Sequence, residues 1–176
     1  MDKLKSNLDF RLMSTQYKFR DLLLPRIEIL KEVGIEPGFS VLDYGCGPGS
    51  YVTPIAELVG ESGKIYALDI HPLAIRMVQG IALRKKLKNV ETILSNCETR
   101  LPDNSIDIVL LYDIFHGLSE PKKILKELHR VLKSNGILSF NDHHMKDNEV
   151  KAKLIDGGFF KLSRKGGRIY TFIKVS

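Results

Sequence analysis

The sequence predicts an α/β fold in which a mostly parallel, seven-stranded sheet carries helices on both of its faces. Three observations favour this fold. Short apolar stretches typical of buried strands alternate with amphipathic stretches typical of helices. A glycine-rich turn follows the first of these strands and leads into a helix. The last two strand-like stretches flank a basic turn that contains two glycines, which predicts a C-terminal antiparallel β-hairpin.

The N-terminal part of the chain, residues 1–37, is expected to form a helical cap. Pro25 can begin a helix and Gly34 can end it, because proline suits a first helical turn and glycine suits the position after the last one. The amphipathic, aromatic segment before that helix has two interpretations. It either packs on the edge of the sheet or forms a lid over a pocket, in which case Tyr17 and Phe19 would contact a substrate.

Residues 38–176 are expected to form the core of a single domain, since no repeat, low-complexity segment or linker indicates a second one. We expect strands at 40–44, 64–69, 90–94, 106–112 and 136–142. We expect helices at 51–59, 72–87 and 121–132, and the closing hairpin at 159–162 and 170–175.

Length and composition limit the functions that the chain can have. The chain has 176 residues, enough for one domain with a sizeable core. Its net charge of +6 leaves an anionic substrate or a nucleic acid open, although the basic residues are scattered or lie on helix faces. The two cysteines form no close C-x-x-C pair, which argues against a zinc knuckle and fits a reducing compartment. We find neither a signal peptide nor an apolar run long enough to span a membrane, and therefore expect a soluble, cytoplasmic protein.

The glycine-rich turn and the strand after it predict a cofactor that contains a nucleoside. Gly45, Gly47 and Gly49 let the backbone turn sharply and let a ligand lie against it. The free N–H groups of the following helix would face that ligand. Asp69 ends the next strand about 20 residues later, where an acid can hold the hydroxyl groups of a ribose.

The same turn argues against a dinucleotide. In the dinucleotide pattern G-x-G-x-x-G/A, the third small residue would fall on Ser50, whereas Gly49 comes one residue early. Asp43, just before the turn, would repel a pyrophosphate but suits a cation. S-adenosylmethionine carries a sulfonium and an ammonium group and no phosphate. An NAD-dependent oxidoreductase is thus the alternative that this turn opposes.

At these residues the chain resembles the class I S-adenosylmethionine-dependent methyltransferases, and among them the branch of ubiquinone and menaquinone biosynthesis. Their first motif, D-x-G-x-G-x-G, is matched position for position by residues 43–49, with Asp69 in register. The resemblance covers roughly residues 38–176. It implies a Rossmann-like sheet with a reversed final strand inserted into it, and S-adenosyl-L-methionine as the cofactor.

Later motifs of that family can be carried over residue by residue. The family's adenine-binding aspartate falls on Asn96, whose carbonyl oxygen is a neutral and weaker acceptor. The backbone N–H of Cys97 would face adenine N1, while its side chain fills space. At the turn into the fifth strand, Ser134 and Asn135 replace a proline and a glycine, and a turn is still expected because asparagine tolerates a positive φ. The cofactor-binding residues that the resemblance implies are Asp43, Gly45, Cys46, Gly47, Gly49, Asp69, Ile70, Asn96, Cys97, Glu98 and Tyr112.

Candidate catalytic residues lie where the fourth and fifth strands end, because ligands of open parallel sheets bind outside the carboxyl ends of the strands. Methyl transfer is an in-line displacement, so much of the catalysis is alignment. A protonated nucleophile also needs a base, for which His116 is the first candidate; its alternative is a histidine that lines the wall or caps a helix. Asp113 would orient the substrate or contact the methionine moiety, or cap a loop. His143 is the third candidate, as the histidine of the fifth strand that faces the substrate.

A metal site is the alternative to these catalytic roles. His116, Asp142, His143 and His144 could together bind zinc or iron. Adjacent residues on an extended strand point to opposite faces, however, so His143 and His144 would not easily share a metal. No metal is expected.

The function expected from the sequence is methyl transfer from S-adenosylmethionine to a small-molecule acceptor. The chain shows no appended recognition domain, and no N-P-P-Y-type tetrapeptide follows the fourth strand. One alternative is a methyltransferase that acts on RNA or protein, as the charge of +6 would favour. Another is a non-catalytic S-adenosylmethionine-binding subunit. A partner, or a second copy in a homodimer, would then complete its shallow pocket.

Overall fold

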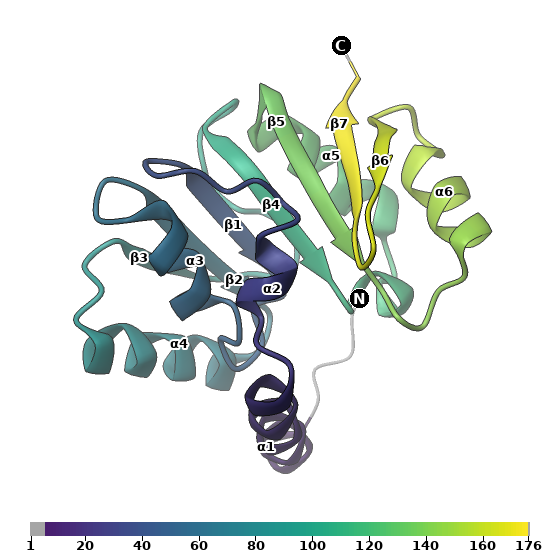
Figure 1. Cartoon of the computed structure of the whole chain (residues 1–176). Helices are drawn as coiled ribbons and strands as arrows, with labels where there is room; N and C mark the ends of the chain where they lie inside the picture. The colour runs from purple at the N-terminus through teal and green to yellow at the C-terminus, as the bar shows by residue number, and fades with distance from the viewer. Residues whose placement is uncertain (1–5, 176) are drawn as a thin grey trace.

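A computed structural model describes residues 6–175 of the chain. Within this part, seven strands form one sheet in the order β3-β2-β1-β4-β5-β7-β6 (Figure 1). Neighbours from β3 to β5 pair in parallel, whereas β7 lies antiparallel between β5 and β6. This confirms the predicted doubly wound sheet and its reversed final strand. The strands are β1 (Ser40–Tyr44), β2 (Lys64–Asp69), β3 (Val90–Leu94), β4 (Ile106–Tyr112), β5 (Leu132–Asn141), β6 (Phe160–Lys165) and β7 (Tyr170–Lys174).

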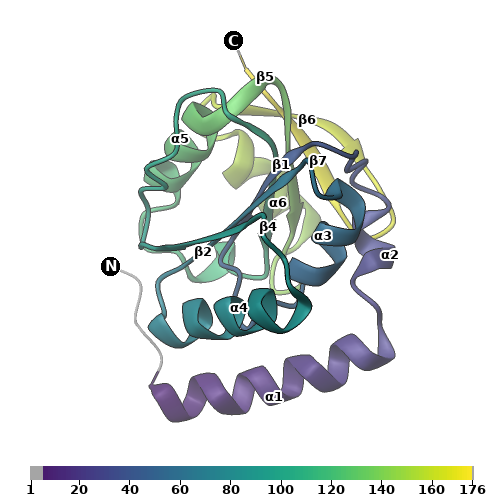
Figure 2. The ribbon, with the colours of Figure 1, turned by 90° about the vertical axis from the view of Figure 1, so that its left-hand side faces the viewer.

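Helices cover both faces of the sheet, as Figure 2 shows with α3 on one side and α5 on the other. Two large buried clusters and a smaller third one result among the described residues. Strand residues contribute to both large clusters because successive side chains point to opposite faces of the sheet. Val41 of β1 packs in one large cluster with α2 and α3, and Leu42 in the other with α5 and α6. The helices are α1 (Asn7–Leu23), α2 (Ile27–Leu30), α3 (Val52–Val59), α4 (Pro72–Lys85), α5 (Pro121–Val131) and α6 (Asp147–Ile155), and a 3₁₀ turn, η1 (Phe115–Gly117), follows β4.

The structure differs from the sequence expectations at three places. Strand β5 begins at Leu132, directly after α5, so the stretch up to Gly136 is extended and Asn135 has no positive φ. Helix α2 has four residues instead of running to Gly34. Helix α6 was not expected, because it starts after Lys146 rather than after a Ser, Thr, Asp or Asn cap. The carboxylate of Glu149 accepts the backbone N–H of Lys146 instead, at 3.0 Å.

Within residues 6–175, none of the helices combines the length and the apolar character that crossing a membrane would require.

Candidate active site

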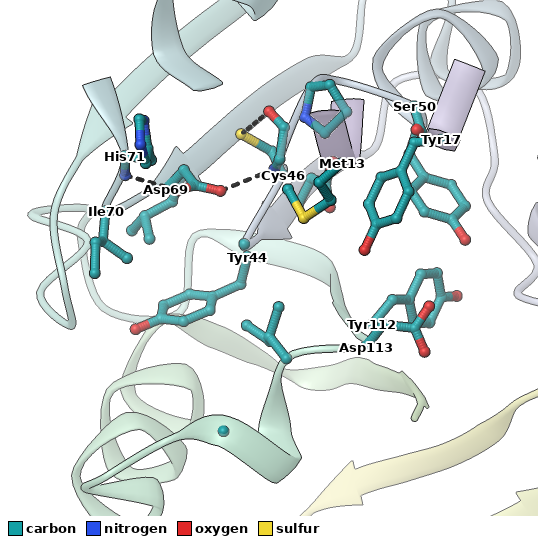
Figure 3. Close-up of a pocket in the computed structure, with 18 of the residues that line it drawn as sticks. Met13, Tyr17, Tyr44, Cys46, Ser50, Asp69, Ile70, His71, Tyr112 and Asp113 are labelled. Carbon is teal, nitrogen blue, oxygen red and sulfur yellow. Dashed lines mark hydrogen bonds between the residues drawn. The ribbon is translucent and has the colours of Figure 1, made fainter. Parts of the chain in front are cut away.

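A cavity of about 370 Å³ lies at the carboxyl ends of β1, β2 and β4 (Figure 3). Helix α1 supplies one of its walls, and the loops after β3 and β4 supply others. The expected site residues that line the cavity are Asp43, Gly45, Cys46, Gly47, Asp69, Ile70, Asn96, Tyr112, Asp113 and His116. The lining does not include Gly49, Cys97, Glu98 or His143.

The glycine turn needs glycine for two separate reasons. Gly45, Gly47 and Gly49 all have positive φ values, of 83°, 51° and 87°, which side chains rarely adopt. At Gly47 no atom lies within 4 Å of the place of a Cβ, so the backbone is open to the cavity. At Gly49 a Cβ would lie 2.8 Å from Ile81 and 3.1 Å from Val78. Gly49 therefore packs the turn against α4.

Two buried acids stand beside this turn. Asp69 accepts the backbone N–H groups of Gly47 and His71, each at 2.8 Å (Figure 3). Asp43 is 3% exposed, and its Oδ2 atom has no hydrogen-bond partner. Burial, and then the charge of Asp69, raises the pKa of Asp43 to about 7. In their ionised forms the two acids give this wall a negative potential, which attracts a cation and repels a phosphate.

Helix α1 contributes Tyr17, which the sequence suggested as a substrate contact, and Met13 and Arg20, which it did not suggest. Met13, Tyr17 and Arg20 line the cavity, and the Arg20 guanidinium lies 4.2 Å from the centre of the Tyr17 ring. Their spacing puts them on one helix face, a signal that could have grouped them. Tyr17 points toward Asp113 (Figure 3). The expectation for Phe19 was wrong: its side chain is 68% exposed and does not line the cavity, because it lies on the opposite face of α1.

His116 is oriented by a buried carboxylate. Its Nδ1 atom lies 2.9 Å from Oδ2 of Asp142, and its backbone N–H donates to the same oxygen at 3.0 Å. The Asp142 side chain is fully buried. Burial opposes its ionised form, but hydrogen bonds from His116 and His144 outweigh this and hold the pKa of Asp142 below its ordinary value. An ionised Asp142 keeps the proton of His116 on Nδ1 and leaves Nε2 free to accept one.

Asp142 was considered in the sequence only as a metal ligand. Its contact with His116 follows from the pairing of β4 with β5, which sets Tyr112 opposite Asn141. The residues after the two strand ends are therefore neighbours.

The histidines after β5 are arranged differently from the expectation. The strand ends at Asn141 and a turn follows, so the rings of His143 and His144 lie side by side with centres 3.9 Å apart. The assumption that they point to opposite faces was wrong. Nδ1 of His143 lies 2.7 Å from Oδ1 of Asp113, whose φ is 55°. His143 thus holds Asp113 from outside the cavity. Among the described residues, no group of three or more His, Cys, Asp or Glu is placed to hold a metal ion.

Comparison with known proteins assigns a family to this arrangement. A family described as a methyltransferase domain matches residues 35–171. The solved structure of a SAM-dependent methyltransferase from Aquifex aeolicus is 31% identical in sequence and superimposes with a TM-score of 0.80. That match covers 91% of this chain and 98% of the Aquifex chain. The chain belongs to the S-adenosylmethionine-dependent methyltransferases.

Curated relatives of this methyltransferase are longer proteins. A demethylmenaquinone methyltransferase of Geobacillus stearothermophilus is 31% identical over 126 residues, which is 71% of this chain and 54% of the relative. A ubiquinone/menaquinone biosynthesis C-methyltransferase of Shewanella baltica is 30% identical over 141 residues, 78% of this chain and 56% of the relative. The chain thus spans about half the length of the curated relatives it matches.

The cavity of the methyltransferase fits the cofactor of its family. The buried Oδ2 atom of Asp43 has no hydrogen-bond partner, and the cationic group of a ligand would supply one. Each Asp69 oxygen already accepts one N–H group and retains a lone pair, so the pair of oxygens could accept two ribose hydroxyls. The open backbone at Gly47 leaves room for a ligand to approach. Arg20, whose guanidinium is paired with Asp21 at 2.9 Å, lines the cavity at the α1 side and could also bind the carboxylate of the methionine moiety.

The loop after β3 carries the predicted adenine contact. Asn96 lines the cavity, and the Tyr44 hydroxyl lies 3.4 Å from the backbone carbonyls of Asn96 and Cys97. The backbone N–H of Cys97 donates to Oγ of Ser95 at 3.2 Å, so the expected contact with adenine requires that bond to be shared or exchanged. Burial raises the pKa of the Cys97 thiol, which fits a space-filling side chain better than a nucleophile.

We expect Gly45→Ala to destabilise the methyltransferase by about 2–4 kcal/mol, because the new Cβ adds a clash to backbone strain. It would lie 2.7 Å from Cδ1 and 3.0 Å from Cγ2 of Ile114, at a φ of +83°. Gly34→Ala is the matched control: its φ is +82°, but nothing lies within 4 Å, so only strain of about 1–2 kcal/mol applies. Urea unfolding compares the two. Equal losses would show that Ile114 does not restrict this position.

We expect Glu127→Gln to loosen the loop beyond Asn96 and to cost about 1–2 kcal/mol at neutral pH. Glu127 accepts the N–H and hydroxyl of Thr99, at 2.8 and 2.6 Å, and binds Arg130 at 2.8 Å. Hydrogen bonding to Arg130 lowers the pKa of Glu127 to about 2. The stabilisation is therefore complete above the ordinary carboxyl range and is lost as the pH falls toward 2.

Urea unfolding at pH 7 and at pH 3 measures this difference, with Glu61→Gln on an exposed loop as the control. A cost for Glu127→Gln that stays the same at both pH values would contradict the ionic origin of the contact.

Proposed function

We propose that this chain transfers the methyl group of S-adenosylmethionine to a small-molecule acceptor. The proposal rests on one observation: an acidic wall and a wall that carries a histidine line the same cavity. Asp43 and Asp69 stand beside the glycine turn, and His116, oriented by Asp142, stands on the β4 side. A cation-binding wall and a base that share one cavity are the two requirements for methyl transfer to a protonated acceptor.

His116 acts as the base in this proposal. Bound S-adenosylmethionine supplies a methyl group activated by the sulfonium, and the acceptor forms its new bond to that carbon as the carbon–sulfur bond breaks. His116 accepts the proton of the acceptor hydroxyl on Nε2, and the Asp142 carboxylate stabilises the imidazolium that results. Asp113, which His143 contacts and toward which Tyr17 points, positions the acceptor.

The acceptor is proposed to be a hydroxylated aromatic ring related to quinones. Apolar and aromatic side chains line much of the cavity, among them Met13, Tyr51, Ile114 and Leu118. Flat rings pack well against such walls. The names of the curated relatives refer to quinone biosynthesis, and one of them to methylation at carbon. A ring hydroxyl that loses its proton to His116 would make the neighbouring ring carbon nucleophilic. After this carbon has taken the methyl group, its C–H proton moves to the ring oxygen, which restores the hydroxyl and the aromatic ring.

The test is methyl transfer from labelled S-adenosylmethionine to a panel of acceptors. The panel contains a reduced naphthoquinone with a short side chain, a catechol, bulk RNA and a basic protein. We expect the label on the naphthoquinol, as a carbon-linked methyl group in its mass and NMR spectra. Label on RNA, with binding that falls steeply as salt rises, would favour the alternative that the charge of +6 suggests.

A second outcome would favour the non-catalytic alternative. If the chain binds S-adenosylmethionine but transfers its methyl group to no acceptor, a cofactor-binding subunit that needs a partner becomes the better account. A cytoplasmic location belongs to the same proposal, because Cys46 and Cys97 are both free and buried, as a reducing compartment allows.

A further inference from the structure

Helix α1 exposes an apolar face that its own fold does not cover. Of the nine large hydrophobic side chains that are exposed among the described residues, six lie between residues 8 and 24. Phe19 is 68% exposed, Leu22 80% and Leu23 79%. We call the following set the outer face of α1: Leu8, Leu12, Phe19, Leu22 and Leu23.

The outer face is an apolar stripe along one side of the helix, interrupted only by the polar residue Thr15. Its residues recur three, four or seven positions apart, which places them on one side of a helix. The opposite side carries Phe10, Met13 and Tyr17, which pack on His71 or line the cavity. Both views show α1 as the outermost helix at the bottom of the molecule (Figures 1 and 2). The helix is thus apolar on two sides, and one of them faces outward.

We propose that the outer face of α1 docks the enzyme on an anionic lipid surface. Leu and Phe on one helix face, flanked by basic residues, are typical of helices that lie in the interface of a bilayer. Arg11 and Lys18, both exposed, flank the stripe on one side, two turns apart. The carboxylate of Asp9 on the other flank accepts the Ser6 hydroxyl, and the backbone N–H of Asp9 donates to Oγ of Ser6. The chain as a whole carries a charge of +6, which adds to the attraction.

A lipid surface suits this face better than a second copy of the chain. A helix of 17 residues is about 25 Å long and about 10 Å wide, so its outer face offers roughly 250 Å². A stable protein interface buries about 800 Å² on each partner. A bilayer needs no complementary partner surface and receives a narrow apolar stripe directly.

The position of α1 suggests what the docking is for, and this part of the inference rests on the proposed function. Its inner side lines the cavity, and only the thickness of the helix separates that cavity from the outer face. A quinone-type acceptor with a long apolar tail resides in the bilayer. Docking through α1 would place the cavity beside the lipid phase, where such an acceptor is concentrated.

Flotation with lipid vesicles tests the docking. We expect the full chain to bind vesicles of phosphatidylcholine and phosphatidylglycerol in equal parts, and to bind phosphatidylcholine alone more weakly. The double variant Phe19→Asp, Leu22→Asp should lower binding by more than about 100-fold. Replacing Arg11 and Lys18 with alanine should lower it about fivefold for each charge. Leu83→Asp is the matched control, since Leu83 is 81% exposed on α4, and it should leave binding unchanged.

Circular dichroism and S-adenosylmethionine binding establish that each variant is folded. The proposal is overturned if the wild type does not bind the vesicles and elutes as a dimer, and if the double variant Phe19→Asp, Leu22→Asp elutes as a monomer. The outer face would then be a homodimer interface. Equal loss in Leu83→Asp would also overturn the proposal.

Assays with a water-soluble, short-chain naphthoquinol separate the two proposals. Methylation without vesicle binding refutes the docking alone, and vesicle binding without methylation refutes the proposed function alone.

Discussion

His116→Asn should lower kcat by about 10²–10⁴-fold while changing the affinity for S-adenosylmethionine less than about twofold. The expected decrease in kcat has this size because a general base acts mainly in the transition state. Asparagine can still donate to Asp142, so the buried carboxylate keeps a partner. It cannot accept the proton of the acceptor. The variant therefore removes the base and retains the local hydrogen bond.

The measurement is the rate of methyl transfer to the acceptor found in the panel. His144→Asn is the control, because the ring of His144 lies 4.2 Å from that of His116 but does not line the cavity. It should keep kcat within about threefold. In His116→Ala, added imidazole should restore part of the rate. A full rate in His116→Asn, or no rescue in His116→Ala, would assign His116 to the wall of the cavity.

Asp43→Asn should have opposite effects on cofactor binding and on stability. We expect the affinity for S-adenosylmethionine at pH 8 to fall about 10–100-fold, because a negative charge next to the cationic groups is lost. Without ligand, the free energy of unfolding should increase by about 2–4 kcal/mol at the same pH, because a buried carboxylate that is only partly compensated is removed.

The pH dependence follows from the pKa of Asp43, which rises from 3.8 to about 7 on folding. Below pH 3.8 the carboxyl is protonated in both the folded and the unfolded chain, and its ionisation costs nothing. Between these values the unfolded chain loses the proton first, so stability falls as the pH rises and levels off above pH 7. The gain from Asp43→Asn should therefore be small at pH 4 and complete at pH 8.

Urea unfolding at both pH values and calorimetric titration with the cofactor test these expectations. Asp156→Asn, an exposed carboxyl paired with Lys122, is the control and should change neither quantity appreciably. A variant that binds S-adenosylmethionine as well as the wild type would contradict the role of Asp43. A variant that is less stable at pH 8 would contradict the raised pKa.

Local spacing carried most of what the sequence could predict. The glycine turn and Asp69 are fixed by residues that are close along the chain, and the structure brings them together at one cavity. The alternation of apolar stretches was sufficient to locate the strands of the parallel sheet, since β1, β2 and β4 are short and largely buried.

The rest of the site could not be predicted because it depends on contacts between residues that are distant along the chain. Asp142 orients His116 only because β4 and β5 are neighbours in a particular register. The histidine pair was misjudged because β5 ends one residue earlier than expected, which puts His143 in a turn. Arg20 enters the site through the packing of α1 across the cavity, and that packing is a tertiary property.

Calorimetric titration of the wild type and of Asp69→Ala with S-adenosylmethionine and with NAD tests the central claim most directly. The account predicts that the wild type binds S-adenosylmethionine and not NAD, and that Asp69→Ala weakens this binding by at least about tenfold through the loss of the ribose contacts. Binding of NAD, or no binding of S-adenosylmethionine to the folded wild type, would contradict it.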